Sequence, residues 1–296
     1  MTRVDDNHAD IAVTTSLLVP SSLPEALDAL AIDGVVPLGG GVRHALDQHD
    51  RKPHRASQFV AVAALDELGS IAWTDHEVVI GAGVTLARVA SDARLAQLWP
   101  VVTESAGLVA TGRIRRMVTL GGNIAARDES HDPPVGLAAA RATMTVRSAS
   151  LSRTLDVLAV GELHPDEIIQ EFRIAHPSRS TGSAYEKFLV RGTWEYASVS
   201  VGAVVELGED GTVSRTTLAV GSVTDGPVLV DLDDLRGAAA EDVVAEAARR
   251  AAATTVPRSD VRGSAEYKTH MIAEFSRRAI RRAIKRATSA STGEQQ

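Results

Sequence analysis

The chain has 296 residues, and its 31 lysines and arginines against 38 aspartates and glutamates give a formal net charge of −7. This acidic balance argues against nucleic-acid binding, which depends on a basic surface. The sequence contains no cysteine, which excludes disulfide bonds, cysteine nucleophiles and iron–sulfur clusters held by this chain. A chain of this length is expected to form two domains.

The N-terminal segment is polar and acidic and lacks the charged and then apolar layout of a signal peptide. Residues 1–15 are therefore expected to form a disordered leader. No apolar run approaches the ~20 residues that a membrane-spanning helix needs. Together with the absence of cysteine, these features predict a cytoplasmic protein.

In the first half of the chain, short apolar runs alternate with glycine turns and helical segments. Residues 20–31 carry serine and proline ahead of apolar residues at helical spacing, which predicts a capped helix. Apolar runs predict strands at the start of 34–41 and in 59–65, and 116–127 is expected to be extended up to its glycine pair. The remaining predicted elements of this half are a strand, a turn and a helix in 76–96, a helix and then a strand in 132–148, and a strand in 166–177.

The pattern changes after residues 178–183, whose sequence SRSTGS is the best linker candidate. Beyond it, three runs alternate apolar and polar residues with period two, and the GEDG of residues 208–211 predicts a hairpin turn between two of them. An antiparallel sheet is therefore expected. The runs are 183–192, 198–207 and 213–223, followed by predicted helices at 240–254 and 264–287 and a disordered tail at 288–296.

The last predicted helix carries a cluster of basic residues beside an apolar face. A charge run at this spacing is usually a solvated face, and we expect that here. The basic residues are Arg277, Arg278, Arg281, Arg282, Lys285 and Arg286, and the apolar ones are Ile272, Phe275, Ala279, Ile280 and Ala283.

Familiar catalytic patterns are incomplete or absent. Gly81 and Gly83 follow a predicted strand like the start of a dinucleotide-binding fingerprint, but Leu86 stands at the third glycine position, so we interpret them as turn glycines. The sequence holds no G-x-S-x-G motif and no metal-binding histidine spacing. His44 and His131 lie near glycine-rich turns and are expected to be surface or structural residues.

Two glycine clusters, PLGGG at 37–41 and TLGGN at 119–123, each follow an apolar run. Consecutive backbone N–H groups at such turns form an anion-binding nest, and glycine lets the backbone approach a phosphate closely. Thr119 and Asn123 can add side-chain hydrogen bonds. Each cluster alone is typical of a plain turn, but the pair predicts a diphosphate site held mostly by backbone donors.

Six motifs follow one another along residues 16–287: PSSLPEALDAL, VPLGGG, IGAGVTLARVA, RIRRMVTLGGNIA, SAYEKFLVR and DVRGSAEYKTHM. Their order resembles the FAD-binding (medium) subunit of molybdenum hydroxylases. That family includes the medium subunit of aerobic carbon monoxide dehydrogenase and the flavin domain of xanthine dehydrogenase. The resemblance implies an α+β fold, with a two-lobed FAD-binding domain over 16–177 and a C-terminal domain of antiparallel strands and helices over 182–287.

The resemblance also implies an oxidoreductase subunit of a heterotrimer. Its FAD would pass electrons from the [2Fe–2S] clusters of a small partner subunit to an external acceptor, while a large molybdopterin-binding subunit oxidises the substrate. The lack of cysteine agrees with this division, because the chain cannot hold such clusters itself.

The family's two diphosphate loops correspond here to residues 38–44 and 119–123. Asp132 matches an aspartate that binds the polar tail of the flavin, and Lys187 matches a lysine near the isoalloxazine edge. Ile114 and Arg115 match an Ile-Arg pair before the second loop. The cofactor-binding residues that the resemblance implies are Leu38, Gly39, Gly40, Gly41, Val42, Arg43, Thr119, Gly121, Gly122, Asn123, Asp132 and Lys187.

Two stretches depart from the family pattern. The first loop is usually A-G-G-T-[DES], but here Val42 lacks the hydroxyl and Arg43 places a cation at an acidic or polar position. After the second loop, AARDESHD replaces the usual N-A-S-P-A-x-D with charged residues, and Glu195 stands where the family often has aspartate. The alternative hypothesis is therefore a flavin-free structural or assembly subunit of the same complex.

Overall fold

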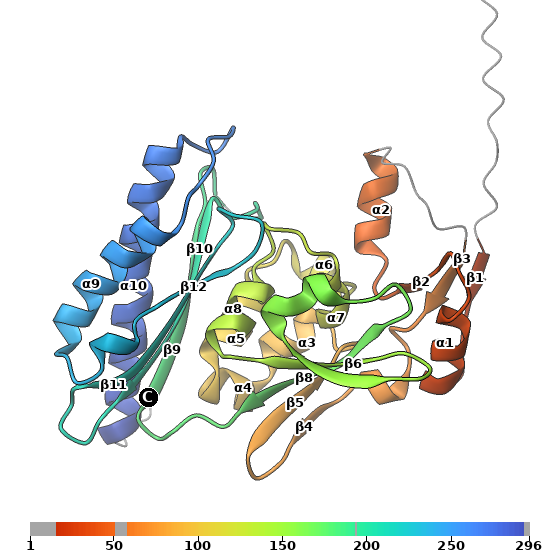
Figure 1. Cartoon of the computed structure of the whole chain (residues 1–296), viewed down its shortest axis with the longest axis horizontal. Helices are drawn as coiled ribbons and strands as arrows, with labels where there is room; N and C mark the ends of the chain where they lie inside the picture. Colours follow the sequence, from red (N-terminus) through yellow and green to blue (C-terminus); the bar gives the residue numbers. More distant parts are fainter. Residues whose placement is uncertain (1–15, 51–57, 193, 293–296) are drawn as a thin grey trace, which may run out of the picture.

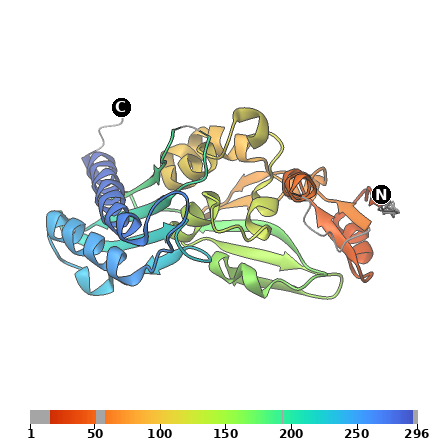
Figure 2. The ribbon, with the colours of Figure 1, turned by 90° about the horizontal axis from the view of Figure 1, so that it is seen from above.

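The computed structural model describes residues 16–50, 58–192 and 194–292, and the strands in these ranges form three sheets. The leader predicted for residues 1–15 and residues 293–296 of the predicted tail lie outside the described residues. The sheets follow one another along the long axis of the molecule, with the C-terminal sheet at one end and the smallest sheet at the other (Figures 1 and 2). No helix in these ranges is both long enough and apolar enough to cross a membrane.

The smallest sheet is parallel. Its strands, in spatial order, are β1 (Ser16–Leu18), β3 (Gln58–Ala61) and β2 (Val35–Leu38). Helix α1 (Leu23–Leu30) packs on the sheet because its apolar residues share one face, and the Ser22 hydroxyl caps it by accepting a hydrogen bond from the Glu25 amide. The predicted helix and the strands β2 and β3 are confirmed, whereas β1 has no counterpart among the predicted elements.

Helix α2 (Val42–His49) begins directly after the glycines that end β2. Gly41, the residue at its N-cap, has a φ of +71°, a left-handed conformation that favours glycine. None of the residues of α2 is buried, and the helix rises away from the small sheet (Figure 1). Individual side-chain contacts, not a hydrophobic core, therefore hold α2 in place.

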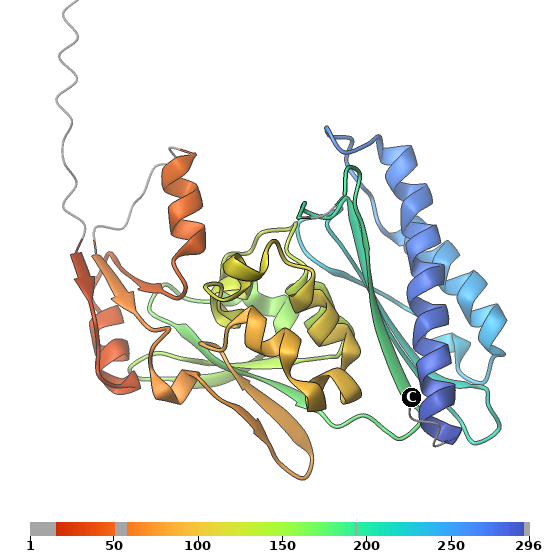
Figure 3. The ribbon, with the colours of Figure 1, turned by 180° about the vertical axis from the view of Figure 1, so that it is seen from behind.

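The central sheet pairs neighbouring strands antiparallel throughout. In spatial order its strands are β4 (Ile71–Trp73), β5 (Glu77–Gly81), β8 (Ile168–Ala175), β6 (Thr143–Arg147) and β7 (Ser152–Asp156). Helices gather between this sheet and the C-terminal sheet (Figure 3), and all of them except Gly112–Arg115 contribute buried residues to the apolar core of the central sheet. They are α3 (Leu86–Ser91), α4 (Ala93–Leu98), α5 (Pro100–Gly107), α6 (Gly112–Arg115), α7 (Leu120–Ala125) and α8 (Pro133–Ala139), and short 3₁₀ helices lie at Asp66–Leu68, Val157–Glu162 and Asp233–Leu235.

The C-terminal sheet is antiparallel, as predicted. In spatial order its strands are β12 (Val228–Val230), β11 (Val213–Gly221), β10 (Val199–Leu207) and β9 (Thr181–Phe188). Two helices, α9 (Ala240–Thr254) and α10 (Ala265–Thr292), cover one face. The other face meets α5 and α8 so closely that a Cβ on Gly202 would lie 2.9 Å from the Cβ of Ala139. The predicted hairpin turn is confirmed, since the Gly208 amide donates to the Thr212 carbonyl between β10 and β11.

The segment 116–127 differs most from its prediction. It is not a strand: apart from an isolated bridge between Thr119 and Thr85, it runs into helix α7, whose first turn contains the glycine pair. Thr119 caps this helix through its hydroxyl, and that local bond outweighs the extended tendency of the apolar run before it.

Two smaller differences lie in the C-terminal half. Strand β9 begins at Thr181, so part of the predicted linker 178–183 pairs with β10. Helix α10 continues to Thr292, beyond the predicted end at residue 287, so residues 288–292 of the predicted disordered tail are helical.

Gly81 and Gly83 are packing glycines. A Cβ on Gly81 would lie 2.2 Å from the carbonyl oxygen of Leu68, and one on Gly83 would lie 3.0 Å from the same oxygen. The strand before them, β5, pairs antiparallel with β8, so it does not begin the parallel unit of a dinucleotide-binding fold. The Val84 amide donates to the Gly81 carbonyl, so both residues also lie in a turn, which agrees with their interpretation as turn glycines.

Candidate functional site

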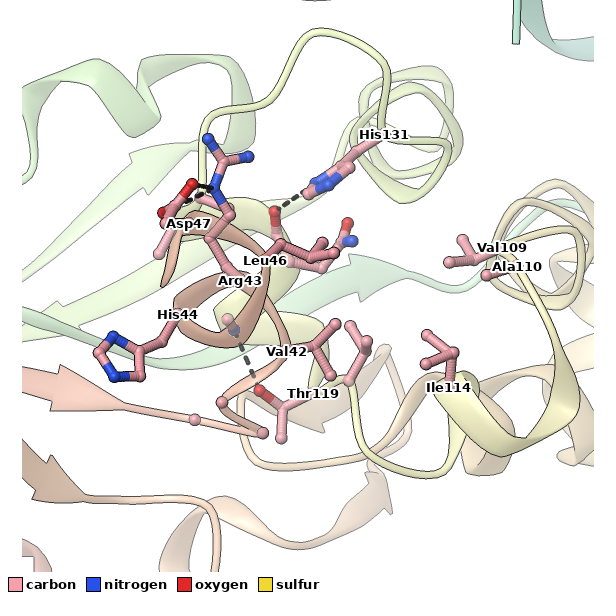
Figure 4. A pocket seen from close by; sticks show the side chains of 18 of the residues that line it. Val42, Arg43, His44, Leu46, Asp47, Val109, Ala110, Ile114, Thr119 and His131 are labelled. Atoms are coloured by element: carbon pink, nitrogen blue, oxygen red, sulfur yellow. Dashed lines mark hydrogen bonds and ion pairs between the residues drawn. The ribbon is translucent and has the colours of Figure 1, made fainter. Parts of the chain in front are cut away.

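A cavity of about 630 Å³ lies where three parts of the chain meet. These are the end of β2 with the start of α2, the segment 109–132, and the end of β9 with residues 194–196. Figure 4 shows α2 on one side of the cavity and Val109, Ala110 and Ile114 on the other. Its volume falls within the range of small-molecule sites, roughly 300–1,000 Å³.

The two glycine segments touch one another at this cavity. A Cβ on Gly39 would lie 2.7 Å from Oγ1 of Thr119, and one on Gly40 would lie 1.7 Å from the carbonyl oxygen of Met117. A Cβ on Gly122 would lie 2.8 Å from the same Thr119 hydroxyl. The close approach of the two segments therefore depends on the missing side chains.

Unpaired polar groups line the same place. Within the described ranges, no acceptor is bonded to the amides of Gly39, Gly40 and Gly41. Oδ1 of Asn123 is buried and has no hydrogen-bond partner in the part of the chain that the structure describes. The half-buried glycine amides suit the oxygens of an anionic group, whereas the buried Oδ1 suits a hydrogen-bond donor of the same ligand, because buried polar groups are nearly always paired.

Asp132 and Lys187 form a buried ion pair at the cavity wall. Lys187 Nζ donates to Oδ2 of Asp132 at 2.8 Å, and the hydroxyl of Tyr185 donates to Oδ1 at 2.5 Å. Burial raises the pKa of Asp132, although the Lys187 charge and the Tyr185 hydroxyl oppose that rise. Burial, together with the Asp132 carboxylate, also raises the pKa of Tyr185 well above its usual value. The Asp132 and Lys187 side chains, which both line the cavity, therefore neutralise each other's charge.

Arg43 bridges α2 and the segment after α7. Its guanidinium lies 3.0 Å from Asp47 and 2.6 Å from Asp128. Asp128 also accepts hydrogen bonds from the amide and hydroxyl of Ser130. Burial alone would raise the pKa of Asp128, but the Ser130 bonds and the charges of His131 and Arg43 lower it to about 2. Asp128 is therefore an anion at neutral pH.

The far wall of the cavity is apolar. Val109, Ala110 and Ile114 line it opposite α2 (Figure 4). Trp194 and Tyr196 line another edge, where their side chains are 71% and 51% exposed. An apolar wall beside a nest of amides suits a ligand that joins a flat ring system to an anionic group.

All of the cofactor-binding residues implied by the resemblance, except Gly121, line the cavity. Gly121 lies behind it, where a Cβ would come within 2.6 Å of the Cβ of Ala82, so it serves the packing of α7. Arg115 is also absent from the lining, because its guanidinium donates to the carbonyls of Val109 and Ala110 at 2.8 Å each. Ile114 does line the cavity.

The two histidines near the glycine turns are both cavity residues with structural contacts. The His44 ring meets the edge of Phe59 at 4.5 Å between centroids, and His131 Nδ1 lies 3.0 Å from the Asn123 carbonyl oxygen. Trp194 and Tyr196 were not singled out by sequence, because they lie in a loop without a motif. The only sign of a binding role in the sequence was that these two aromatic residues flank Glu195.

Comparison with known families accounts for the arrangement. A model described as the FAD binding domain in molybdopterin dehydrogenase matches residues 12–176. The chain belongs to this family. A second model, the C-terminal domain of CO dehydrogenase flavoproteins, matches residues 183–283. The protein is thus an FAD-binding-type medium subunit of a molybdopterin dehydrogenase, an oxidoreductase complex, and the resemblance and fold class expected from the sequence are confirmed.

Individual relatives of this medium subunit agree. The medium chain of carbon monoxide dehydrogenase from Afipia carboxidovorans is 30% identical over 288 residues, which cover 90% of this chain and 96% of that protein. The medium subunit of nicotine 6-hydroxylase from Paenarthrobacter nicotinovorans is also 30% identical, over 88% of this chain and 94% of that one. Solved structures of CO dehydrogenase from Oligotropha carboxidovorans and of quinoline 2-oxidoreductase from Pseudomonas putida 86 each superpose with a TM-score of 0.85, at 27% and 25% identity, over 92% of this chain and 98% of theirs.

Proposed function

We propose that this medium subunit binds FAD in the cavity between its two glycine segments. In the complex it would receive electrons from [2Fe–2S] clusters of a small partner subunit and deliver them to an external acceptor, while a molybdopterin-binding large subunit oxidises the substrate. The observation that carries the proposal is the nest of unpaired glycine amides, which meets the second glycine segment at one cavity.

The diphosphate of FAD would be held mainly by backbone groups. The amides of Gly39, Gly40 and Gly41 would donate to phosphate oxygens. Oδ1 of Asn123 has no partner among the described residues and would accept a hydrogen bond from a hydroxyl of the cofactor, since a diphosphate offers no donor. Val42 supplies no hydroxyl, so the cradle relies on the glycines more than on side chains.

The remaining residues would orient the cofactor and exclude water. The apolar wall around Ile114 would cover a flat ring, and the Asp132–Lys187 pair would present hydrogen-bonding groups without a net charge. When bound, FAD supplies the redox chemistry, accepting electrons and passing them on, and the chain supplies the placement.

The test is a titration of the purified, flavin-free chain with FAD, followed by tryptophan fluorescence and by the visible absorbance of the washed complex. One equivalent of retained flavin is expected, with no comparable binding of NAD. A protein that stays colourless but still assembles with the molybdopterin and iron–sulfur subunits would overturn the proposal and support the flavin-free structural subunit.

A further inference from the structure

His131 is held at the cavity by one of its two ring nitrogens (Figure 4). Its Nδ1 lies 3.0 Å from the carbonyl oxygen of Asn123 in α7. Because a carbonyl only accepts hydrogen bonds, Nδ1 carries a proton, and Nε2 is the nitrogen that gains or loses one. Nε2 forms no hydrogen bond with the residues that the structure describes. The bond to α7 therefore orients a ring that lines the cavity and leaves Nε2 available to a ligand.

The strongly basic residues of the cavity are already engaged. Within the described lining these are Arg43 and Lys187, which contact Asp128 at 2.6 Å and Asp132 at 2.8 Å. Neither offers an uncompensated positive charge to a ligand. His131 differs, because it forms no ion pair with a carboxylate in the described ranges, although the charges of Asp128 and Asp132 reach it. A protonated His131 therefore adds an adjustable positive charge to the cavity.

We propose that protonated His131 binds the diphosphate of FAD through Nε2, so that the chain holds FAD more tightly as the pH falls. This inference rests on the proposed function. A diphosphate that joins two groups is a dianion, and a charged N–H donor forms a stronger hydrogen bond to it than a neutral donor does. In the neutral imidazole, Nε2 presents a lone pair and has no proton to donate. One side chain whose charge depends on pH would thus supplement the glycine amides of the first segment.

The charged and titratable groups around His131 come from several elements. Asp128 and Asp132 lie on its own segment, and the Tyr196 ring lies 6.5 Å away between centroids. Asp128 and Tyr196 each keep one charge state between pH 6 and pH 8, because the pKa of Asp128 is about 2 despite its burial and burial raises the pKa of Tyr196. The other charged or titratable groups of the lining are Arg43, His44, Asp47, Lys187 and Glu195. All of these groups stay in place when His131 alone is changed.

The experiment measures the FAD dissociation constant of the full chain at pH 6 and at pH 8. The unaltered protein should bind FAD about tenfold more tightly at pH 6, the gain expected of one charged hydrogen bond. His131→Asn keeps a donor near the position of Nδ1 but has no group near that of Nε2, so it should lose most of this difference. His270→Asn changes an exposed histidine of α10 that does not line the cavity, and it should keep the full difference.

His131→Gln separates a ligand contact from a structural role. It places an amide donor near the position of Nε2 but none near that of Nδ1. Its dissociation constant should be the same at both pH values and lie between the two values of the unaltered protein. If His131 only supported α7 through the Asn123 carbonyl, the Gln variant would bind FAD less tightly than the Asn variant at both pH values. That result, or an Asn variant that keeps the tenfold difference, overturns the inference.

A second titration, with inorganic pyrophosphate, covers the case in which the unaltered chain binds no FAD. That failure overturns the proposed function, and the pyrophosphate data then decide the role of His131. On going from pH 8 to pH 6, the unaltered chain should gain about tenfold more affinity for pyrophosphate than His131→Asn gains. Equal gains in the two proteins, or no binding of pyrophosphate, overturn the inference as well.

Discussion

At the scale of single residues, the buried group of Asp132, Lys187 and Tyr185 shows how the site handles charge. The family pattern assigned Asp132 and Lys187 separate roles toward the flavin, but in the folded chain each is the partner of the other at 2.8 Å. A buried charge without its partner is costly, so neither residue can be removed alone without penalty. Their first role is to satisfy one another at the cavity wall.

Replacing Lys187 with methionine should therefore destabilise the protein by roughly 3 kcal/mol. The change removes a charge that lowers the pKa of Asp132, so that already raised pKa rises further. A carboxyl whose pKa is raised by folding stabilises the folded state below its unfolded pKa of about 3.9, and this stability is lost as the pH rises through its folded pKa. The stability difference between the variant and the unaltered protein should therefore grow from acidic to neutral pH.

Urea unfolding at several pH values measures this deficit. The double variant Lys187→Met with Asp132→Asn is the control, because it removes both charges. It should recover most of the stability, and its remaining deficit should not change with pH. A deficit that is the same at every pH would contradict the account.

At the scale of elements, the turn between β2 and α2 depends on how closely it approaches the segment before α7. Gly40 is the tightest point, since a Cβ there would lie 1.7 Å from the carbonyl oxygen of Met117. Backbone occupies that space and cannot rotate away as a side chain can. The two segments must separate if any side chain is added.

Gly40→Ala should consequently lower the free energy of unfolding by roughly 2 kcal/mol. The loss in the free energy of FAD binding should be larger than this loss in stability. Gly226→Ala is a matched control, because its Cβ would meet no atom within 4 Å. Thermal unfolding and FAD titration of both variants check the prediction. Equal behaviour of the two would mean that the segments separate easily.

At the scale of the whole molecule, Glu104 joins the central helices to the C-terminal domain. Its carboxylate accepts hydrogen bonds from Arg282 at 2.5 Å, from Arg286 at 2.6 Å and from the amide of Tyr185 at 2.8 Å. These arginines were expected on a solvated face, and that expectation is wrong for them, because α10 packs against β9 and turns them toward Glu104. The network fixes β9, the strand that carries Lys187 to the cavity and Tyr185 to Asp132.

Glu104→Ala should lower the free energy of unfolding by roughly 2 kcal/mol, since it leaves charged donors without their shared acceptor. Glu241→Ala removes another ion pair of α10, with Arg281, but both side chains there are more than half exposed. That control should cost less than about 1 kcal/mol. Chemical unfolding compares the two, and a similar loss in both would show that Glu104 is no more than a surface partner.

Local patterns were sufficient for much of the fold. Period-two alternation around GEDG predicted the hairpin of β10 and β11, and helical spacing predicted α9 over residues 240–254. Such patterns work because neighbours in sequence form the element. The prediction for residues 116–127 was wrong because an apolar run alone does not distinguish a strand from the residues that lead into a capped helix.

The sequence by itself determined the class of the protein and its two glycine segments, and all but one of the cofactor-binding residues predicted from it line the cavity. Local chemistry specifies these, and motif order carries the family. Only the tertiary structure decided that Arg43 meets Asp128, that Asp132 meets Lys187 and that Glu104 meets α10. Each pair joins residues far apart in the chain, and the packing of distant elements alone decides which charges face one another and which face a ligand.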